Sequence, residues 1–204
     1  MVGLIEDLSQ TCGQGWRQAG DVIYLLGLPL GETGNGTVTL GGSDYLAAIH
    51  GQVAGKPPQI DVALELAVQA ACRHGIRQGW VQSAHDLSEG GLAVALAEAC
   101  ISGGLGAEVE LAKTSSRWDT LLFGEGGGRI VVSVSPAHAE IWQRFLDQTL
   151  PGRHQRLGTV GTASQPLQVT TQLSETPSAT TLLQLSVSRL KDPWQFAIER
   201  ALSQ

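Results

Sequence analysis

The stretch SAHDLSEGG (residues 83–91) gathers the side chains best suited to chemistry in this 204-residue chain. His85 and Asp86 stand next to each other and could act as a general acid/base pair. Asp86 and Glu89 could instead hold Mg²⁺, which binds carboxylate oxygens. A single His–Asp pair is a weak signal, so the residue types alone do not decide between these chemistries.

The paired glycines at the end of this stretch allow a third interpretation. If a strand leads into a helix that starts near Glu89, free backbone N–H groups would point at a phosphate, and Gly90 and Gly91 would let it approach closely. The alternative is purely structural. In that case Asp86 or Ser88 caps the helix, and the glycines let the helix pack on a sheet.

A glycine-rich loop around Glu125 is the second candidate site. LLFGEGGGRIVVSV (121–134) places Glu125 ahead of a β-branched run, so its carboxylate could reach a ligand at the end of a strand. The loop lacks the lysine of a P-loop, and a strand rather than a helix follows it, which favours an irregular connection. The other histidines show no metal-ligand spacing, so no metal site is predicted.

The composition is that of a soluble globular protein. A net charge of −6 and the absence of a basic stripe argue against nucleic-acid binding. The most apolar segment, 92–101, is too short to span a bilayer, and no secretion signal is recognised. The three cysteines form no CxxC pair, which indicates reduced thiols and a cytoplasmic location.

Apolar runs and turn residues predict alternating strands and helices. Strands are predicted at 20–30, 37–40, 80–84, 106–111, 129–134, 156–163 and 167–173. Helices are predicted at 43–50, about 59–76, 89–102 and 136–146. The polar run 174–181 predicts a mobile linker, before one more strand at 182–190 and a helix at 192–202 with Asp192 as its cap and Pro193 at its first position. The fold class is α/β, bordering on α+β, in a single layered domain.

Five strings occur in an order that resembles one enzyme family. They are VGLIEDL (2–8), LGGSDYL (40–46), GKPPQIDVALE (55–65), SAHDLSEGGLAVALAE (83–98) and LFGEGGGRIVVSV (122–134). Together they resemble the C-terminal part of phosphoribosylformylglycinamidine synthase, in the aminoimidazole ribonucleotide (AIR) synthetase superfamily, over about residues 1–170. The resemblance implies a mixed β-sheet covered by helices.

The resemblance implies a role in purine biosynthesis. The family's ligase makes formylglycinamidine ribonucleotide from formylglycinamide ribonucleotide, ATP and ammonia, and a partner glutaminase releases the ammonia from glutamine. The γ-phosphate of ATP activates an amide oxygen, and ammonia then displaces phosphate. Because charge develops on phosphate oxygens, the complete enzyme is expected to use ATP with Mg²⁺.

The resemblance also implies that this chain is one part of that enzyme. Residues 1–19 correspond to the end of a preceding N-terminal-type domain, 20–173 to the C-terminal AIR-synthetase-like domain, and 174–204 to a polar linker and C-terminal helix. The family's catalytic histidines and most ATP and Mg²⁺ ligands lie in its N-terminal domains. No catalytic residue is therefore expected in this chain, and the missing N-terminal domains are its expected partners.

The resemblance points to candidate binding residues. The first half of the family's enzyme places a Glu-Ser-Gln stretch in the substrate pocket, and the related place here is Glu125, Gly126 and Gly127. These glycines lack the hydroxyl and amide that could bind a ribonucleotide. Some members hold a structural nucleotide in the second pocket, whose wall SAHDLSEGG could form. The candidates for nucleotide or phosphate binding are His85, Asp86, Ser88, Glu89, Gly90, Gly91 and Glu125.

Two functions from different classes remain open. The first is a domain of the ligase that is inactive alone. The alternative is a non-catalytic binding or assembly module with the same fold, and an unselected gene fragment is a third reading. Because family members pair these domains about two-fold axes, exposed apolar edges and self-association, for example as a homodimer, are expected.

Overall fold

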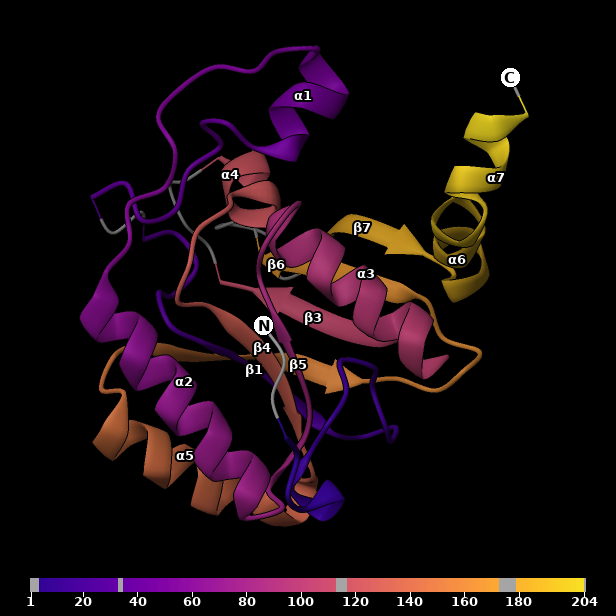
Figure 1. The fold of residues 1–204 in the computed structure, drawn as a ribbon. Helices are drawn as coiled ribbons and strands as arrows, with labels where there is room; N and C mark the ends of the chain where they lie inside the picture. Colours follow the sequence, from indigo (N-terminus) through magenta and orange to yellow (C-terminus); the bar gives the residue numbers. More distant parts are fainter. Residues whose placement is uncertain (1–3, 33–34, 113–116, 173–178, 204) are drawn as a thin grey trace.

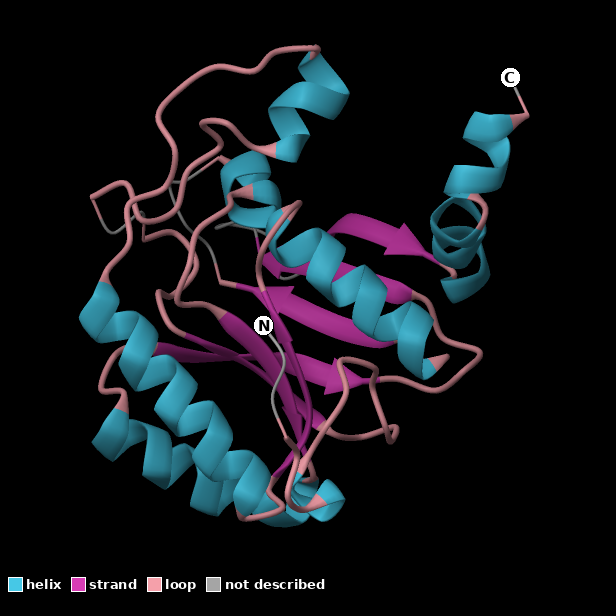
Figure 2. Ribbon diagram, viewed as in Figure 1, coloured by secondary structure: helices cyan, strands magenta, loops and turns pink. Residues whose placement is uncertain are grey.

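The computed structural model describes residues 4–32, 35–112, 117–172 and 179–203, in which helices cover a seven-stranded sheet (Figures 1 and 2). The strands are β1 (Val22–Leu26), β2 (Val81–Asp86), β3 (Ala107–Leu111), β4 (Ile130–Val134), β5 (His154–Val160), β6 (Leu167–Gln172) and β7 (Ala179–Leu185). The α-helices are α1 (Asp44–His50), α2 (Val62–Arg77), α3 (Gly91–Gly103), α4 (Trp118–Phe123), α5 (Ala139–Thr149), α6 (Val187–Gln195) and α7 (Ala197–Leu202). Short 3-10 helices span Leu8–Gln10 and Pro136–His138.

The sheet is mixed, as the resemblance implies. Its strand order is β2-β4-β1-β5-β3-β6-β7, in which β3 and β6 run parallel and every other neighbouring pair is antiparallel. All five residues of β1 are buried, because β1 pairs with β4 and β5 and has helices on both faces. This accounts for the continuous apolar run in its sequence.

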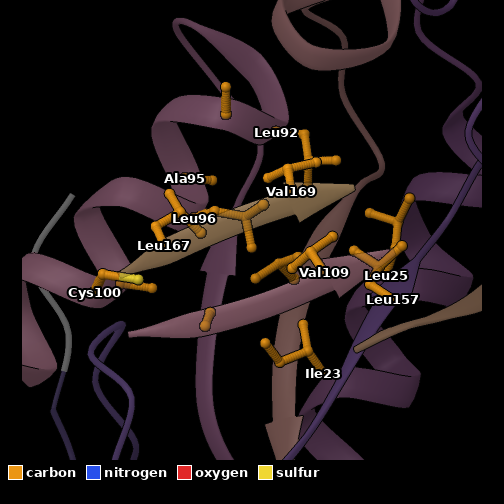
Figure 3. Close-up of a cluster of buried hydrophobic side chains, with 14 of the residues drawn as sticks. Ile23, Leu25, Leu92, Ala95, Leu96, Cys100, Val109, Leu157, Leu167 and Val169 are labelled. Atoms are coloured by element: carbon orange, nitrogen blue, oxygen red, sulfur yellow. The ribbon is translucent and has the colours of Figure 1, made fainter. Parts of the chain in front are cut away.

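One face of the sheet packs against α3. Leu92, Leu96 and Cys100 of this helix contact a cluster of strand residues that includes Ile23 and Val109 (Figure 3). Seven of the thirteen residues of α3 are buried, whereas Val94 and Ser102 are exposed on its outer side. Figure 1 shows α3 lying across the strands, with α4 beyond its N-terminal end.

The opposite face packs against α2 and α5. Trp142 of α5 is fully buried there, and Gly75 of α2 lies directly against its ring. The cysteines among the described residues are free thiols. Burial raises the pKa of Cys72, on α2, to about 12 and that of Cys100, on α3, to about 11, which keeps both thiols protonated and unreactive.

Several predicted elements have different boundaries in the structure. The predicted strand at 37–40 is wrong, because this segment forms a single bridge, between Thr39 and Glu125. The predicted linker falls partly outside the described residues, but 179–181 belong to β7, which pairs with β6 along the sheet. The prediction that Asp192 caps the last helix is also wrong. Ser186 caps α6, and Pro193 lies inside that helix.

Asp21, just before β1, is a buried carboxylate. Its side chain has no solvent-exposed surface, and among the described residues its carboxylate oxygens make no hydrogen bond of normal geometry, although the nearby backbone N–H of Gln18 offsets part of the effect of burial. Burial disfavours the charged form, which raises the pKa of the Asp21 carboxyl. No helix among the described residues is both long and apolar enough to cross a membrane.

Replacing Gly75 by alanine is expected to destabilise the domain by about 1–3 kcal/mol, the cost of overpacking a core. The added Cβ would lie 2.6 Å from a ring carbon of Trp142 and 2.7 Å from a methyl carbon of Val81. Urea denaturation measures the effect. Gly13→Ala is the matched control, because nothing lies within 4 Å of its added Cβ. Equal stabilities of the two variants would contradict the packing argument.

The buried carboxylate of Asp21 predicts a pH dependence. Because its folded-state pKa is raised, its contribution to stability is fully present below the unfolded pKa and is lost as the pH rises through the folded value. Asp21→Asn removes this titration, so its stability relative to the wild type should increase from pH 4 to pH 8. Thermal unfolding across this range tests the difference. A difference that stays constant with pH would show that Asp21 titrates normally.

Candidate functional site

The carboxylate of Glu125 connects segments that are far apart in the sequence. Its Oε1 atom accepts hydrogen bonds from the backbone N–H of Asp44, the first residue of α1, and of Gly90, the N-cap residue of α3, both at 2.9 Å. The backbone of Glu125 also exchanges two hydrogen bonds with Thr39. One internal anion is therefore shared by two helix N-termini, where a negative charge is stabilising.

The corner before α3 is built differently from the prediction. Asp86 ends strand β2, and the helix begins at Gly91 rather than Glu89. Gly90 occupies the N-cap position with a φ of 75°, and no side chain caps the helix. The N–H of Gly91 donates to the carbonyl of Ser88, and that of Gly90 is taken by Glu125. Neither N–H group is thus free to bind an external phosphate.

The side chain of His85 is held by contacts within the fold. Its Nε2 lies 2.8 Å from Oε2 of Glu98 on α3, and its side chain is 11% exposed. Its Nδ1 lies 3.5 Å from a carboxylate oxygen of Asp86. The other oxygen of Glu98 accepts a hydrogen bond from the indole of Trp194 on α6. His85 therefore joins β2, α3 and α6, instead of forming an acid/base pair that faces a ligand.

A pocket of about 570 Å³ brings four of the predicted residues together. Asp86, Ser88 and Glu89 line one side of it, and the loop from Glu125 to Gly128 lines the other. Helix α2 contributes Glu65 and Gln69, and the pocket also reaches Pro58, Leu87, Arg129 and Ile130. We call this the acidic pocket, because four of its lining residues carry carboxylates: Glu65, Asp86, Glu89 and Glu125.

A second hollow, of about 420 Å³, lies between α1 and α3. Ser88 and Glu89 line both hollows, and Gly90 lines this second one. Its apolar lining includes Tyr45 and Phe123, whose rings stack at 4.8 Å, and Ile49. The corner before α3 therefore separates two hollows. Gly91 lines neither hollow, and a Cβ added to it would lie 2.7 Å from the backbone carbonyl oxygen of Gly124.

Close backbone contacts require most of the glycines in the loop around Glu125. A side chain at Gly126 would collide with the carbonyl oxygen of Thr37, and one at Gly124 with that of Thr120. Gly128 has a φ of 68°, which disfavours any other residue. Gly127 is exposed, and an added Cβ there would meet only the side-chain carboxylate of Glu65. The missing hydroxyl at Gly126 is therefore a consequence of how tightly this loop packs.

Arg129 is a site residue that the sequence analysis missed. It lines the acidic pocket but is only 3% exposed, and its Nη2 donates to the carbonyl of Gly124 at 2.6 Å. Its Nε has no partner, and no ion pair joins it to a carboxylate among the described residues. Burial lowers the pKa of its guanidinium to about 10, so it remains charged at neutral pH. The sequence did contain a signal for this residue, because Arg129 is a charged side chain directly before the buried strand β4.

Removing the carboxylate of Glu125 should destabilise the domain. Glu125→Ala deletes two charge-assisted hydrogen bonds and leaves the backbone N–H groups of Asp44 and Gly90 without their acceptor, which should cost about 2–3 kcal/mol. Glu125→Gln retains the acceptor and should cost less. Urea denaturation of both variants measures the losses. Glu110→Ala, on the exposed face of β3, is the control and should change stability by less than about 0.5 kcal/mol. An equally small loss for Glu125→Ala would show that the carboxylate does not hold the helices.

Known proteins match this chain along most or all of its length. It is 54% identical over 204 residues to the phosphoribosylformylglycinamidine synthase subunit PurL of a Cyanothece species, and 60% identical over 171 residues to that of a Synechococcus species. These alignments cover 100% and 84% of this chain but 25% and 22% of the relatives. The chain thus spans about a quarter of the length of these relatives.

Solved structures share its fold. The Thermotoga maritima assembly PurLQS matches with a TM-score of 0.64 at 18% identity, covering 90% of this chain and 28% of that one. Escherichia coli HypE, a hydrogenase maturation protein, matches with a TM-score of 0.55 at 20% identity, covering 84% and 52%. Residues 18–164 match the family described as AIR synthase related protein, C-terminal domain. Because this match covers well over half of the chain, the protein belongs to the family of AIR synthase related C-terminal domains.

Proposed function

We propose that this chain is the C-terminal domain, or a truncated form, of a phosphoribosylformylglycinamidine synthase. The complete enzyme would be an ATP-dependent C–N ligase that converts formylglycinamide ribonucleotide and ammonia to formylglycinamidine ribonucleotide in purine biosynthesis. The observation that carries this proposal is the 54% identity to a PurL subunit along all 204 residues. The alignment extends over the whole chain, so it includes both candidate segments and the C-terminal helices.

The described residues of this chain do not form a complete site for ATP with Mg²⁺. No group of three or more His, Cys, Asp or Glu side chains that could hold a metal ion occurs among the described residues. The acidic pocket has Arg129 as the one cation of its lining, and the N–H groups of Gly90 and Gly91 are already bonded within the protein. A bound phosphate there would face several carboxylates, which is unfavourable without further cations.

The role of this domain would therefore be to provide one wall of a ligand pocket. Asp86, Ser88, Glu89 and the loop of Glu125 would form that wall, while His85 and Gly91 would hold its shape. A Thermotoga maritima PurL has been solved with ATP and with FGAR, which supports nucleotide binding in relatives of this chain. The cations and the catalytic groups would come from the preceding domains.

The proposed enzyme has further parts. Residues 1–19 would end the preceding N-terminal-type domain, and 20–173 would form the AIR-synthetase-like domain, with 174–204 as a C-terminal appendage. The Thermotoga structure named PurLQS supports an enzyme of several subunits. We expect one of them to be the glutaminase that supplies ammonia, and we expect the enzyme to be cytoplasmic.

The chain alone should not turn over ATP. With formylglycinamide ribonucleotide, Mg²⁺ and a high concentration of ammonium, a coupled assay should detect no ADP above background. A chimera in which this chain replaces the matching quarter of the Cyanothece PurL subunit should release ADP in a substrate-dependent manner. The unmodified Cyanothece subunit is the positive control. Substrate-dependent ADP release by the chain alone, or an inactive chimera beside an active control, would contradict the proposed function.

A further inference from the structure

Strand β7 forms one edge of the seven-stranded sheet and has a free outer side. It pairs with β6, and its backbone makes no hydrogen bond to another described segment. Its sequence, ATTLLQL, contains neither charged residues nor proline, which commonly keep sheet edges from pairing. The register with β6 shifts at Leu182, so the edge consists of two short regular stretches. Such an edge can accept another strand on its outer side.

Helices α6 and α7, which follow β7 along the chain, carry exposed apolar side chains. Trp194, Ile198 and Leu202 stand at intervals of four residues, and they are 53%, 77% and 82% exposed. Helix α6 itself packs against α3 and the core cluster beneath it, and the indole of Trp194 donates a hydrogen bond to Glu98. The exposed row therefore begins on a helix that is held against the core.

We call β7, α6 and α7 together the C-terminal edge. In Figure 1 these elements lie on the side of the molecule away from α2 and α5. They line neither the acidic pocket nor the hollow between α1 and α3, and they lie outside the residues 18–164 that match the family. A standard protein interface takes roughly 20–30 residues a side, so the strand and the helices would have to act together.

A second copy of this chain fits both features with one symmetry operation. A two-fold axis perpendicular to the sheet runs two β7 strands antiparallel, which is the arrangement in which a strand pairs with itself. The same axis leaves α6 and α7 of both copies on the same face of the joined sheet. Strand pairing and burial of the apolar row can therefore occur together.

The charges of the C-terminal edge also favour a second copy. Helices α6 and α7 contain three basic and two acidic side chains, and β7 contains none, whereas the whole chain has a net charge of −6. Identical surfaces repel each other when they carry charges of one sign. Because the signs are mixed here, two copies can meet at this edge with little repulsion.

From these features we infer that the C-terminal edge is the surface through which two copies of this chain pair, with the sheet continuing from β7 of one copy to β7 of the other. The inference does not rest on the proposed function, because neither pocket takes part in it. It assigns a role to elements that lie beyond the family match.

The segment from α1 to α2 is the main competing surface. It also exposes large apolar side chains, such as Ile49 at 65% and Leu66 at 61%. However, residues 44–66 contain three acidic side chains and one basic side chain, so two copies that met there would bring like charges together. This segment contains no strand whose edge could pair.

Sedimentation velocity of the 204-residue chain at increasing concentration tests the inference. Leu202→Lys places a charge in the apolar row on α7. Leu66→Lys is the matched control, because it makes the same change at another exposed leucine on a helix. Both positions are exposed, and urea denaturation checks that the two variants are folded. Hydrogen exchange followed by mass spectrometry reports separately on the amides of β7.

The unmodified chain should change from monomer to dimer as its concentration rises. Leu202→Lys should raise the dissociation constant of the dimer by roughly a hundredfold, because the two-fold axis makes each lost contact count twice. Leu66→Lys should leave it unchanged. The amides of β7 should exchange more slowly at concentrations where the dimer forms, but not in Leu202→Lys.

Three results would overturn the inference. A chain that stays monomeric at every concentration would leave the C-terminal edge to some other part of the longer relatives. Dimers that Leu66→Lys disrupts and Leu202→Lys does not would assign pairing to the segment from α1 to α2. Dimers in which the amides of β7 exchange as fast as in the monomer would show that the sheet does not continue between copies.

Discussion

The carboxylate of Glu125 is the interaction on which the arrangement of the site depends. It binds the first backbone N–H of α1 and the N-cap N–H of α3, while its own backbone pairs with Thr39. This one residue thus joins the segment at Thr39, the start of α1 and the turn before α3, which are far apart in the sequence. Because helix N-termini carry partial positive charge, an anion between two of them stabilises both. This contact ties the start of α1 to the N-terminal end of α3, which packs on the sheet, and the second hollow lies between the two helices.

The same interaction changes the function that the corner can perform. The geometry of a strand leading to a helix N-terminus is one that often binds phosphate. Here an internal carboxylate occupies that position, and four of the thirteen residues that line the adjoining pocket are acidic. The buried Arg129 donates to a backbone carbonyl and supports the loop rather than balancing these charges. Among the described residues that line this pocket, Arg129 is the one cation beside four carboxylates, so a phosphate placed there would meet an excess of negative charge.

The features that were predictable from the sequence are those set by nearby residues. The apolar spacing placed α1 and α2 closely, although the predicted start of α2, at about 59, lies before Asp61, which caps the helix. The predicted start of α3, at Glu89, was wrong because Gly90 adopts a left-handed conformation and is the N-cap residue. No side chain caps the helix, although Asp86 and Ser88 are residue types that commonly do so. The strand β7 was partly missed because its Thr-rich sequence resembles a linker until it pairs with β6.

Contacts between distant residues could not be predicted in this way. Glu125 is 81 residues from Asp44 and 35 from Gly90, and no local pattern records that their atoms meet. The glycines after Glu125 illustrate the same difficulty. By resemblance, Gly126 and Gly127 are two equivalent losses of ligand-binding side chains, yet the structure separates them. Gly126 must be glycine because the carbonyl of Thr37 fills the space for a side chain, whereas Gly127 faces the pocket with room limited only by Glu65. Backbone packing thus requires glycine at position 126. Only position 127 leaves room for a side chain that could contact a ligand.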